Sequence, residues 1–272
     1  MMITFPNAKI NLGLNVVSRR PDGYSNLETV FYPIPVCDAL ELLDSDEKGL
    51  KFVQTGLEVD GDVEKNLVVR AFRAVEKAAG RTFDAEVHLQ KSIPFGAGIG
   101  GGSADASFMI RMMNEHYHLG WSDEKMAEIA ITIGADCPIF IYNRPMYAEG
   151  KGEILSDIDV NLSGYYFVLV KPNVHVSTAD AFRGITPAPA KINCRDIVSL
   201  PMKEWKGKLE NDFEKTIFAL HPSVAAIKEK LYELGAVYAS MSGSGSSLFG
   251  FFEEKPNLEG LFGDAYVFCE KL

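Results

Sequence analysis

The densest cluster of unusual residues in this chain is PFGAGIGGGSADAS, residues 94–107, which has five glycines in the seven positions 96–102. Ordering glycine costs more conformational entropy than ordering any other residue, so such a run indicates positive φ angles or a group that approaches the main chain closely. The run leads into SADASFMIRMMNEHYH, whose apolar residues recur at helical spacing and for which Ser103 is the predicted N-cap. Glycines that feed a helix N-terminus expose N–H groups at the positive end of the helix dipole, and phosphate is the natural ligand there.

Two common nucleotide motifs fit this loop poorly. Gly96, Gly98 and Gly101 satisfy the GxGxxG spacing, but the preceding segment 85–93 alternates between apolar and polar residues. The first strand of a dinucleotide-binding fold is instead buried on both faces and almost continuously apolar. No Lys-Ser or Lys-Thr pair follows the glycines, so the loop is not a P-loop. A loop that is rich in glycine for packing alone remains the alternative.

The elements around the loop can be predicted from periodicity and caps. Alternation predicts a strand over 8–17, with Lys9 and Asn11 on the face opposite the core, and further strands over 27–35 and 38–44 as an antiparallel meander. A helix is expected over 66–80, between the cap Asn66 and the terminating Gly80. Strand 85–93 precedes the glycine loop, and a further helix is expected from Ser122 to Gly134.

The second half of the chain mixes both kinds of element. A buried strand is expected over 165–172, a short capped helix over 177–182, helices over 204–220 and 222–235, and a glycine-interrupted hairpin over 240–252. The stretch 186–193, TPAPAKIN, is the most linker-like segment. Together these patterns predict an α+β architecture.

The composition excludes several classes of protein. The chain has 272 residues, which suffices for one large domain or two lobes, and its formal net charge of −10 disfavours binding to nucleic acid or acidic lipid. No segment reaches the length of apolar residues that a membrane span needs, and we expect a cytoplasmic protein. The four cysteines are far apart and have no zinc-type spacing, so reduced thiols are expected.

Five blocks of sequence, in a fixed order, carry a resemblance to a known family. They are PNAKINLGL, RPDGYSNLETVF, PFGAGIGGGSADA, GADCPIF and SGSGSSLFG. The chain resembles the GHMP kinases, and within them the kinases that act on a cytidine diphosphate substrate in the non-mevalonate isoprenoid pathway. The resemblance implies a two-lobed fold. Residues 1–160 would form an ATP-binding lobe, a ribosomal S5-like α/β sandwich, and residues 161–272 a substrate-binding α/β sandwich.

The resemblance also implies which residues bind ATP and Mg²⁺. Asn66 and Lys91 are candidates near adenine, and the Ser103 hydroxyl is a candidate for phosphate or Mg²⁺. The residues of the glycine loop that would hold the phosphates are Pro94, Gly96, Gly98, Gly100, Gly101, Gly102, Ser103 and Ala104.

Two charged residues match the catalytic pair of the family. Asp136, in GADCP, would take the proton of the substrate hydroxyl, and Lys9 would pair with Asp136 and offset charge on the transferred phosphate. From the residues alone, Asp136 could equally cap a turn, and Lys9 could be a solvated lysine on a strand face.

The substrate residues follow from the same resemblance. Tyr24 and Phe182 would stack on cytosine, and Asn11 and Thr178 would supply polar contacts. The family usually has His after the Tyr, where this chain has Ser25, so only main-chain contacts are expected there. Gly243 and Gly245 would form a second glycine turn near the substrate diphosphate, although an ordinary hairpin loop fits their spacing too.

Competing functions share most of these features. A kinase for mevalonate, homoserine or a sugar is the alternative within the same family, and RPDGYSN is the block that argues against it. A non-catalytic ligand sensor would have no use for Lys9 and Asp136 together. The oligomeric state is left open between a monomer and a weak dimer, and a small-molecule substrate is expected, with no nucleic-acid or membrane partner.

Overall fold

The chain, whose computed structural model describes residues 1–57 and 62–272, forms two compact units. Each unit is assembled from three separate stretches of chain. Unit 1 comprises 1–8, 36–95 and 100–144, and unit 2 comprises 9–35, 96–99 and 145–272. The units are therefore interleaved in sequence. They are compact units defined by contacts and not the lobes expected from the resemblance, so the lobe boundary at residue 160 stays a prediction.

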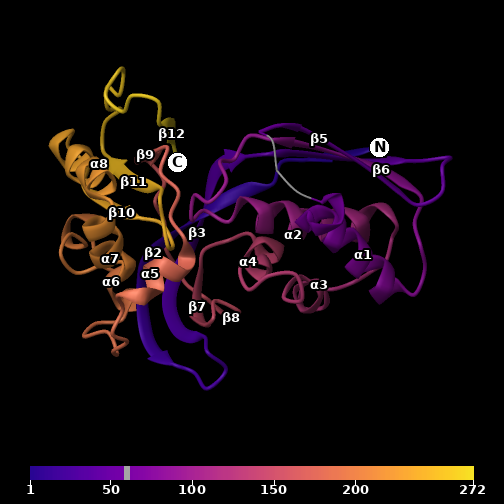
Figure 1. The fold of residues 1–272 in the computed structure, drawn as a ribbon, viewed down its shortest axis with the longest axis horizontal. Helices are drawn as coiled ribbons and strands as arrows, with labels where there is room; N and C mark the ends of the chain where they lie inside the picture. The colour runs from indigo at the N-terminus through magenta and orange to yellow at the C-terminus, as the bar shows by residue number, and fades with distance from the viewer. Residues whose placement is uncertain (58–61) are drawn as a thin grey trace. The chain divides into compact units, whose positions relative to one another are not determined.

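Unit 1 combines a mixed sheet with helices, which lie together on one side of it (Figure 1). The strand order is β1-β4-β6-β5, antiparallel except for the β5/β6 pair. The strands are β1 (Met2–Thr4), β4 (Ala39–Asp44), β5 (Leu50–Gly56) and β6 (Ala85–Lys91). The helices are the 3₁₀ turn η1 (Val63–Lys65), α1 (Leu67–Ala79), α2 (Gly101–His116), α3 (Asp123–Ala130) and α4 (Cys137–Tyr142).

The local signals in unit 1 are mostly confirmed. The Asn66 side chain caps α1 by accepting the Val68 N–H at 2.9 Å, and Gly80 ends the helix in the left-handed conformation with φ 67°. Ser122 caps α3 as expected. Strand β6 buries alternate residues, which supports the distinction from a dinucleotide-binding strand.

Three expectations for unit 1 are wrong. Helix α2 begins at Gly101, with Gly100 at the N-cap, so Ser103 lies inside the first turn and caps nothing. Gly100 reaches φ 73°, which lets the helix begin earlier than a Ser cap would allow. Helix α3 ends at Ala130 and continues to Gly134 only as turns. Strand β4 pairs with β1 and β6, so the predicted meander stops after its second strand.

Unit 2 contains two further sheets. Their orders are β2-β3-β7-β8 and β10-β11-β9-β12. The strands are β2 (Asn7–Arg19) and β3 (Ser25–Cys37), each mostly in this unit, β7 (Met146–Gly150), β8 (Ile154–Asp157), β9 (Tyr166–Lys171), β10 (Tyr238–Met241), β11 (Leu248–Phe252) and β12 (Tyr266–Lys271). The helices are α5 (Thr178–Arg183), α6 (Cys194–Ile197), η2 (Met202–Glu204), α7 (Phe213–Leu220) and α8 (Pro222–Glu233).

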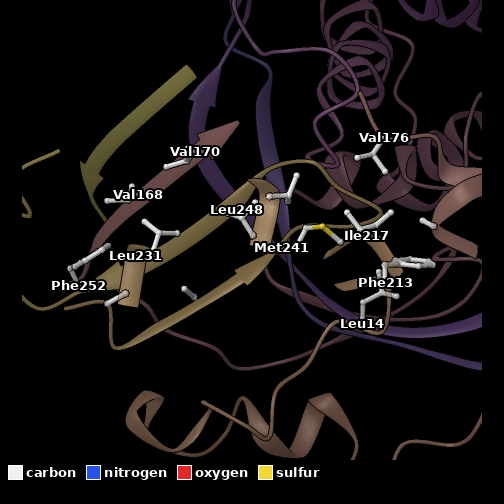
Figure 2. Packing of buried hydrophobic residues seen from close by; sticks show 14 of the residues in the cluster. Leu14, Val168, Val170, Val176, Phe213, Ile217, Leu231, Met241, Leu248 and Phe252 are labelled. Atoms are coloured by element: carbon white, nitrogen blue, oxygen red, sulfur yellow. The ribbon is translucent and has the colours of Figure 1, made fainter. Parts of the chain in front are cut away.

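Helices α7 and α8 supply much of the core that unit 2 builds against the second of these sheets. Figure 2 shows Phe213 and Ile217 of α7 and Leu231 of α8 in one buried cluster with strand residues such as Val168 and Leu248. The predicted helix over 204–220 is wrong in its first half, because Gly207 adopts φ 76° and the helix starts only at Phe213. Within the described residues, no helix is long and apolar enough to cross a membrane.

Candidate active site

Lys9 is the centre of a buried polar cluster in unit 2. Its side chain extends from β2 and is only 3% exposed, and Asn11 on the same strand is 2% exposed. The Lys9 ammonium donates to Asn11 Oδ1 at 2.8 Å and to the Gly98 carbonyl at 3.4 Å, and it lies 4.8 Å from the centroid of the Phe31 ring. The alternative of a solvated strand lysine is therefore wrong, since an ammonium is buried only when it is paired.

The first part of the glycine loop packs against the second glycine turn, also within unit 2. The Ser242 hydroxyl donates to the Gly98 carbonyl at 2.9 Å, and the Ser247 N–H donates to the Ala97 carbonyl. A Cβ on Gly98 would lie 2.2 Å from the Ser242 carbonyl oxygen, and one on Gly243 would lie 2.9 Å from the Gly98 oxygen. At these two positions glycine is required because the loops touch, so packing accounts for part of the glycine run.

Asn211 holds the second turn in place. Its amide donates to the carbonyls of Met241 and Gly243, both at 2.8 Å. Gly243 and Gly245 adopt φ 55° and 95°, conformations that favour glycine. The roles of Asn211 and Ser242 could not be predicted from the sequence. Asn211 precedes a helix and Ser242 lies in a glycine-serine run, and neither position indicates which distant carbonyl the side chain binds.

The residues expected to bind the substrate have different environments in unit 2. Tyr24 is 61% exposed, and the Lys151 ammonium lies 4.7 Å from its ring centroid. Phe182 is half-buried and packs edge-on against Phe213, with centroids 4.7 Å apart. The Thr178 hydroxyl is 3.3 Å from that of Ser244 in the second glycine turn.

Ser25 is buried at the start of β3. The structure therefore brings Thr178 to the second glycine turn, leaves Tyr24 available to a ligand, and gives Phe182 a packing role beside any contact with a base.

In unit 1, the N-terminus of α2 has a geometry that suits an oxyanion. Gly100 has no side chain to cap the helix, and the first intrahelical bond runs from the Ala104 N–H to the Gly100 carbonyl. The N–H groups of Gly101, Gly102 and Ser103 consequently have no partner inside the helix. An oxyanion at this end would receive these hydrogen bonds and the favourable field of the dipole.

The glycines that open α2 are also constrained by packing. A Cβ on Gly101 would lie 2.7 Å from Ile93 Cγ2 and 3.1 Å from the Lys91 ammonium nitrogen, and one on Gly102 would lie 3.3 Å from Leu67. A larger residue at Gly101 would therefore press against the side chains of Ile93 and Lys91. Pro94 is half-buried where the loop begins.

Asp136 lies at the start of α4, where it is half-buried and makes no side-chain capping bond to that helix. Asp136 thus occupies the N-cap position of α4 without capping it through its side chain. The next residue, Cys137, is buried, and burial raises the pKa of its thiol to about 11, although hydrogen bonding to Ser103 acts in the opposite direction. Cys137 is thus a neutral thiol. Asp136 and Lys9 belong to different units, and their pairing stays a prediction.

Lys91 takes part in an ion cluster that the sequence did not indicate. Its buried ammonium donates to Asp38 and, at 2.8 Å, to Asp105 Oδ2 on α2. The other oxygen of Asp38 accepts the N–H groups of Ser92 and Ile93, where the chain leaves β6 for the glycine loop. The cluster therefore fixes the approach to the loop. Lys91 stays a predicted ATP ligand, but its ammonium is already engaged by the side chains of Asp38 and Asp105.

Asp105 should make folding stability depend on pH. Burial raises its pKa to about 8 from an ordinary value of 3.8, although the Lys91 charge acts in the opposite direction, and its Oδ1 atom is buried without a hydrogen-bond partner. Between these pH values the unfolded chain has released the proton that the folded chain retains, so the free energy of unfolding falls as pH rises.

Asp105→Asn cannot titrate. We expect the stability of the parent relative to this variant to decline between about pH 4 and pH 8, by no more than about 1.4 kcal/mol per pH unit. Urea denaturation of both proteins at several pH values would measure it, and parallel pH curves would contradict it.

The Asn66 side chain caps α1 through its oxygen, and its amide nitrogen also donates to Gln54 at 3.1 Å. A contact with adenine would have to coexist with both bonds.

Across residues 1–57 and 62–272, no group of three His, Cys, Asp or Glu side chains could hold a metal ion. A metal at this site would rely on phosphate oxygens and on hydroxyls such as that of Ser103.

Comparison with known proteins agrees with this geometry. Residues 66–144 match the GHMP kinases N terminal domain, and residues 201–262 match the GHMP kinases C terminal domain. A protein of Parabacteroides distasonis is 52% identical over 98% of both chains, and one of Bacteroides fragilis is 51% identical over 98% of both. The chain therefore belongs to the GHMP kinase family, whose members are ATP-dependent phosphotransferases with the two-domain α+β fold.

Both relatives are named 4-diphosphocytidyl-2-C-methyl-D-erythritol kinase. The crystal structure of a 4-(cytidine 5'-diphospho)-2C-methyl-D-erythritol kinase superposes with a TM-score of 0.81 at 29% identity, covering 98% of each chain. A mevalonate kinase of Methanococcus jannaschii superposes with a TM-score of 0.71 at 14% identity, covering 100% of this chain and 98% of the other, which shows the shared fold alone.

Proposed function

We propose that this kinase transfers the γ-phosphoryl group of ATP to the 2-hydroxyl of 4-diphosphocytidyl-2-C-methyl-D-erythritol, a step in isoprenoid precursor biosynthesis. The observation that carries the proposal is the buried Lys9 ammonium, held by Asn11 and by the Gly98 carbonyl of the glycine loop. Burying this charge is costly, and a cation beside a phosphate-binding loop has a clear use in phosphoryl transfer. The half-identical relatives with that substrate in their names support the choice of substrate.

Each group has a defined task in this reaction. The substrate oxygen attacks the γ-phosphorus, the bond to the β–γ bridging oxygen breaks, and ADP leaves. The N–H groups of the first turn of α2, which have no partner inside the helix, would hold phosphate oxygens. Lys9 would offset the charge of these oxygens, and Asp136 would accept the proton of the hydroxyl. Ser103 would contribute to binding Mg²⁺, which when present neutralises charge on the phosphates. Few protein ligands suffice for this ion because it usually retains water and phosphate oxygens as ligands.

A coupled assay of ADP release with a panel of alcohols tests the proposal. The panel contains the cytidine substrate, its uridine analogue, mevalonate, homoserine and a hexose, each with ATP and Mg²⁺. We expect turnover with the cytidine substrate alone. Preference for another alcohol would contradict the substrate assignment, and ATP binding without turnover on any of them would favour a sensor.

Tyr24 gives a specific test of cytosine recognition. Its exposed ring can offer a stacking surface worth about 1 to 3 kcal/mol per base, so Tyr24→Ala should raise KM for the cytidine substrate roughly 5- to 150-fold without changing KM for ATP. Tyr166→Ala, which changes another tyrosine that is not fully buried, is the matched control and should leave both constants unchanged. An unchanged KM for the cytidine substrate in Tyr24→Ala would show that Tyr24 does not contact cytosine. The assignment of kinase activity would still stand.

We also propose a cytoplasmic location and activity as a monomer or weak dimer, with no nucleic-acid partner. The net charge of −10 supports the last of these, because phosphate backbones repel an acidic protein.

A further inference from the structure

Thr29 on β3 has a buried hydroxyl that makes hydrogen bonds to two residues of β2. It is 1% exposed, and its hydroxyl donates to the Gly13 carbonyl at 2.6 Å. Gly13 has φ 70° in the middle of β2, a departure from strand geometry. The Asn11 amide nitrogen donates to the same hydroxyl oxygen at 3.0 Å. Thr29 thus joins two positions on the strand that carries Lys9.

The direction of these hydrogen bonds fixes the Asn11 side chain. A hydroxyl has a single hydrogen, and in Thr29 the Gly13 carbonyl, which can only accept, takes it. Towards Asn11 the hydroxyl can then only accept, so the NH₂ side of the amide must face Thr29. The Oδ1 atom consequently faces Lys9, from which it accepts a hydrogen bond at 2.8 Å. A flipped amide would place two donors, the NH₂ group and the ammonium, against each other.

We infer that Thr29 is a positioning residue for phosphoryl transfer, which fixes the Lys9 ammonium through the orientation of Asn11. The inference rests on the proposed function, in which Lys9 meets charge on the transferred group. Lys9 is then held by contacts from three parts of unit 2: Asn11 on β2, the Phe31 ring on β3 and the Gly98 carbonyl. Without the hydroxyl, the first of these contacts loses its fixed direction.

Thr29→Val keeps the shape of the side chain and removes the hydroxyl, and Thr29→Ser restores it. We expect Thr29→Val to lower kcat about tenfold, the effect of one hydrogen bond to a charged group, with KM for ATP within twofold of the parent value. Thr29→Ser should recover most of kcat. Ser240→Ala is the matched control, because this buried hydroxyl donates to Glu214 and has no connection to Lys9. It should lower Tm and leave kcat unchanged.

The Lys9→Met background separates positioning from stability. If Thr29 acts through Lys9, Thr29→Val should change single-turnover rates less than twofold in that background, while its effect on Tm persists. A tenfold loss in both backgrounds, or parent kcat in folded Thr29→Val, would overturn the inference.

A measurement without substrate keeps this test independent of the reaction. The NMR signal of the Lys9 side chain, assigned by its loss in Lys9→Met, should shift in Thr29→Val and return in Thr29→Ser. An unshifted signal would overturn the inference even if the enzyme acted on another alcohol. Lack of turnover with the cytidine substrate would contradict the proposed function alone.

Discussion

Asp136→Asn should lower kcat by about 10² or more while ATP binding and the melting temperature stay close to those of the parent. The amide keeps the size of the carboxylate but cannot accept the proton of the attacking hydroxyl, a contribution of about 10² to 10⁴ in rate. The Asp136 side chain makes no capping bond to α4, so the substitution removes no helix cap. Initial rates at saturating ATP and a thermal shift with ATP would measure both effects.

Asp123→Asn is the matched control for this variant. Asp123 is an exposed carboxylate in the first turn of the neighbouring helix α3, and its loss should leave kcat within twofold of the parent. Near-parent turnover in Asp136→Asn would remove Asp136 from the role of general base. Loss of ATP binding in the same variant would instead indicate a role in the nucleotide site.

Lys9→Met should have a comparable effect, about a 10²-fold loss of kcat. Methionine has similar length and fills the buried space, but it supplies no charge to the transferred phosphoryl group. It also leaves Asn11 Oδ1 and the Gly98 carbonyl without the ammonium donor, so a moderate fall in Tm is expected as well. Lys125→Met, which removes an exposed lysine paired with Glu128, is the control and should change neither quantity appreciably.

The double variant Lys9→Met with Asp136→Asn tests whether the two residues work together. If they serve one transition state as a unit, the combined loss should be far smaller than the product of the single losses, because removing either residue already removes most of the benefit. Multiplicative losses would mean that Lys9 and Asp136 act independently, and the predicted pairing would be wrong.

Several elements could be predicted because their signals lie within a few neighbouring residues. Asn66 and Gly80 mark the ends of α1, and the alternation over 85–93 distinguished β6 from a dinucleotide-binding strand. Capping bonds and apolar periodicity act within one or two turns, so neighbouring residues suffice to reveal them. The family and most candidate site residues came from the ordered motifs. The relatives and the fold confirmed the family, and the roles of the site residues stay predictions.

The way these residues are held depends on contacts between distant parts of the chain. The hydrogen bond from Ser242 to Gly98 joins positions 144 apart in sequence, and the ion pair of Lys91 with Asp38 joins positions 53 apart. The packing of Gly101 against Ile93 and the orientation of Asn11 by Thr29 are of the same kind. Such contacts leave no periodicity in the sequence, because a buried polar group accepts any correctly placed partner, and only the fold determines which partner is within reach.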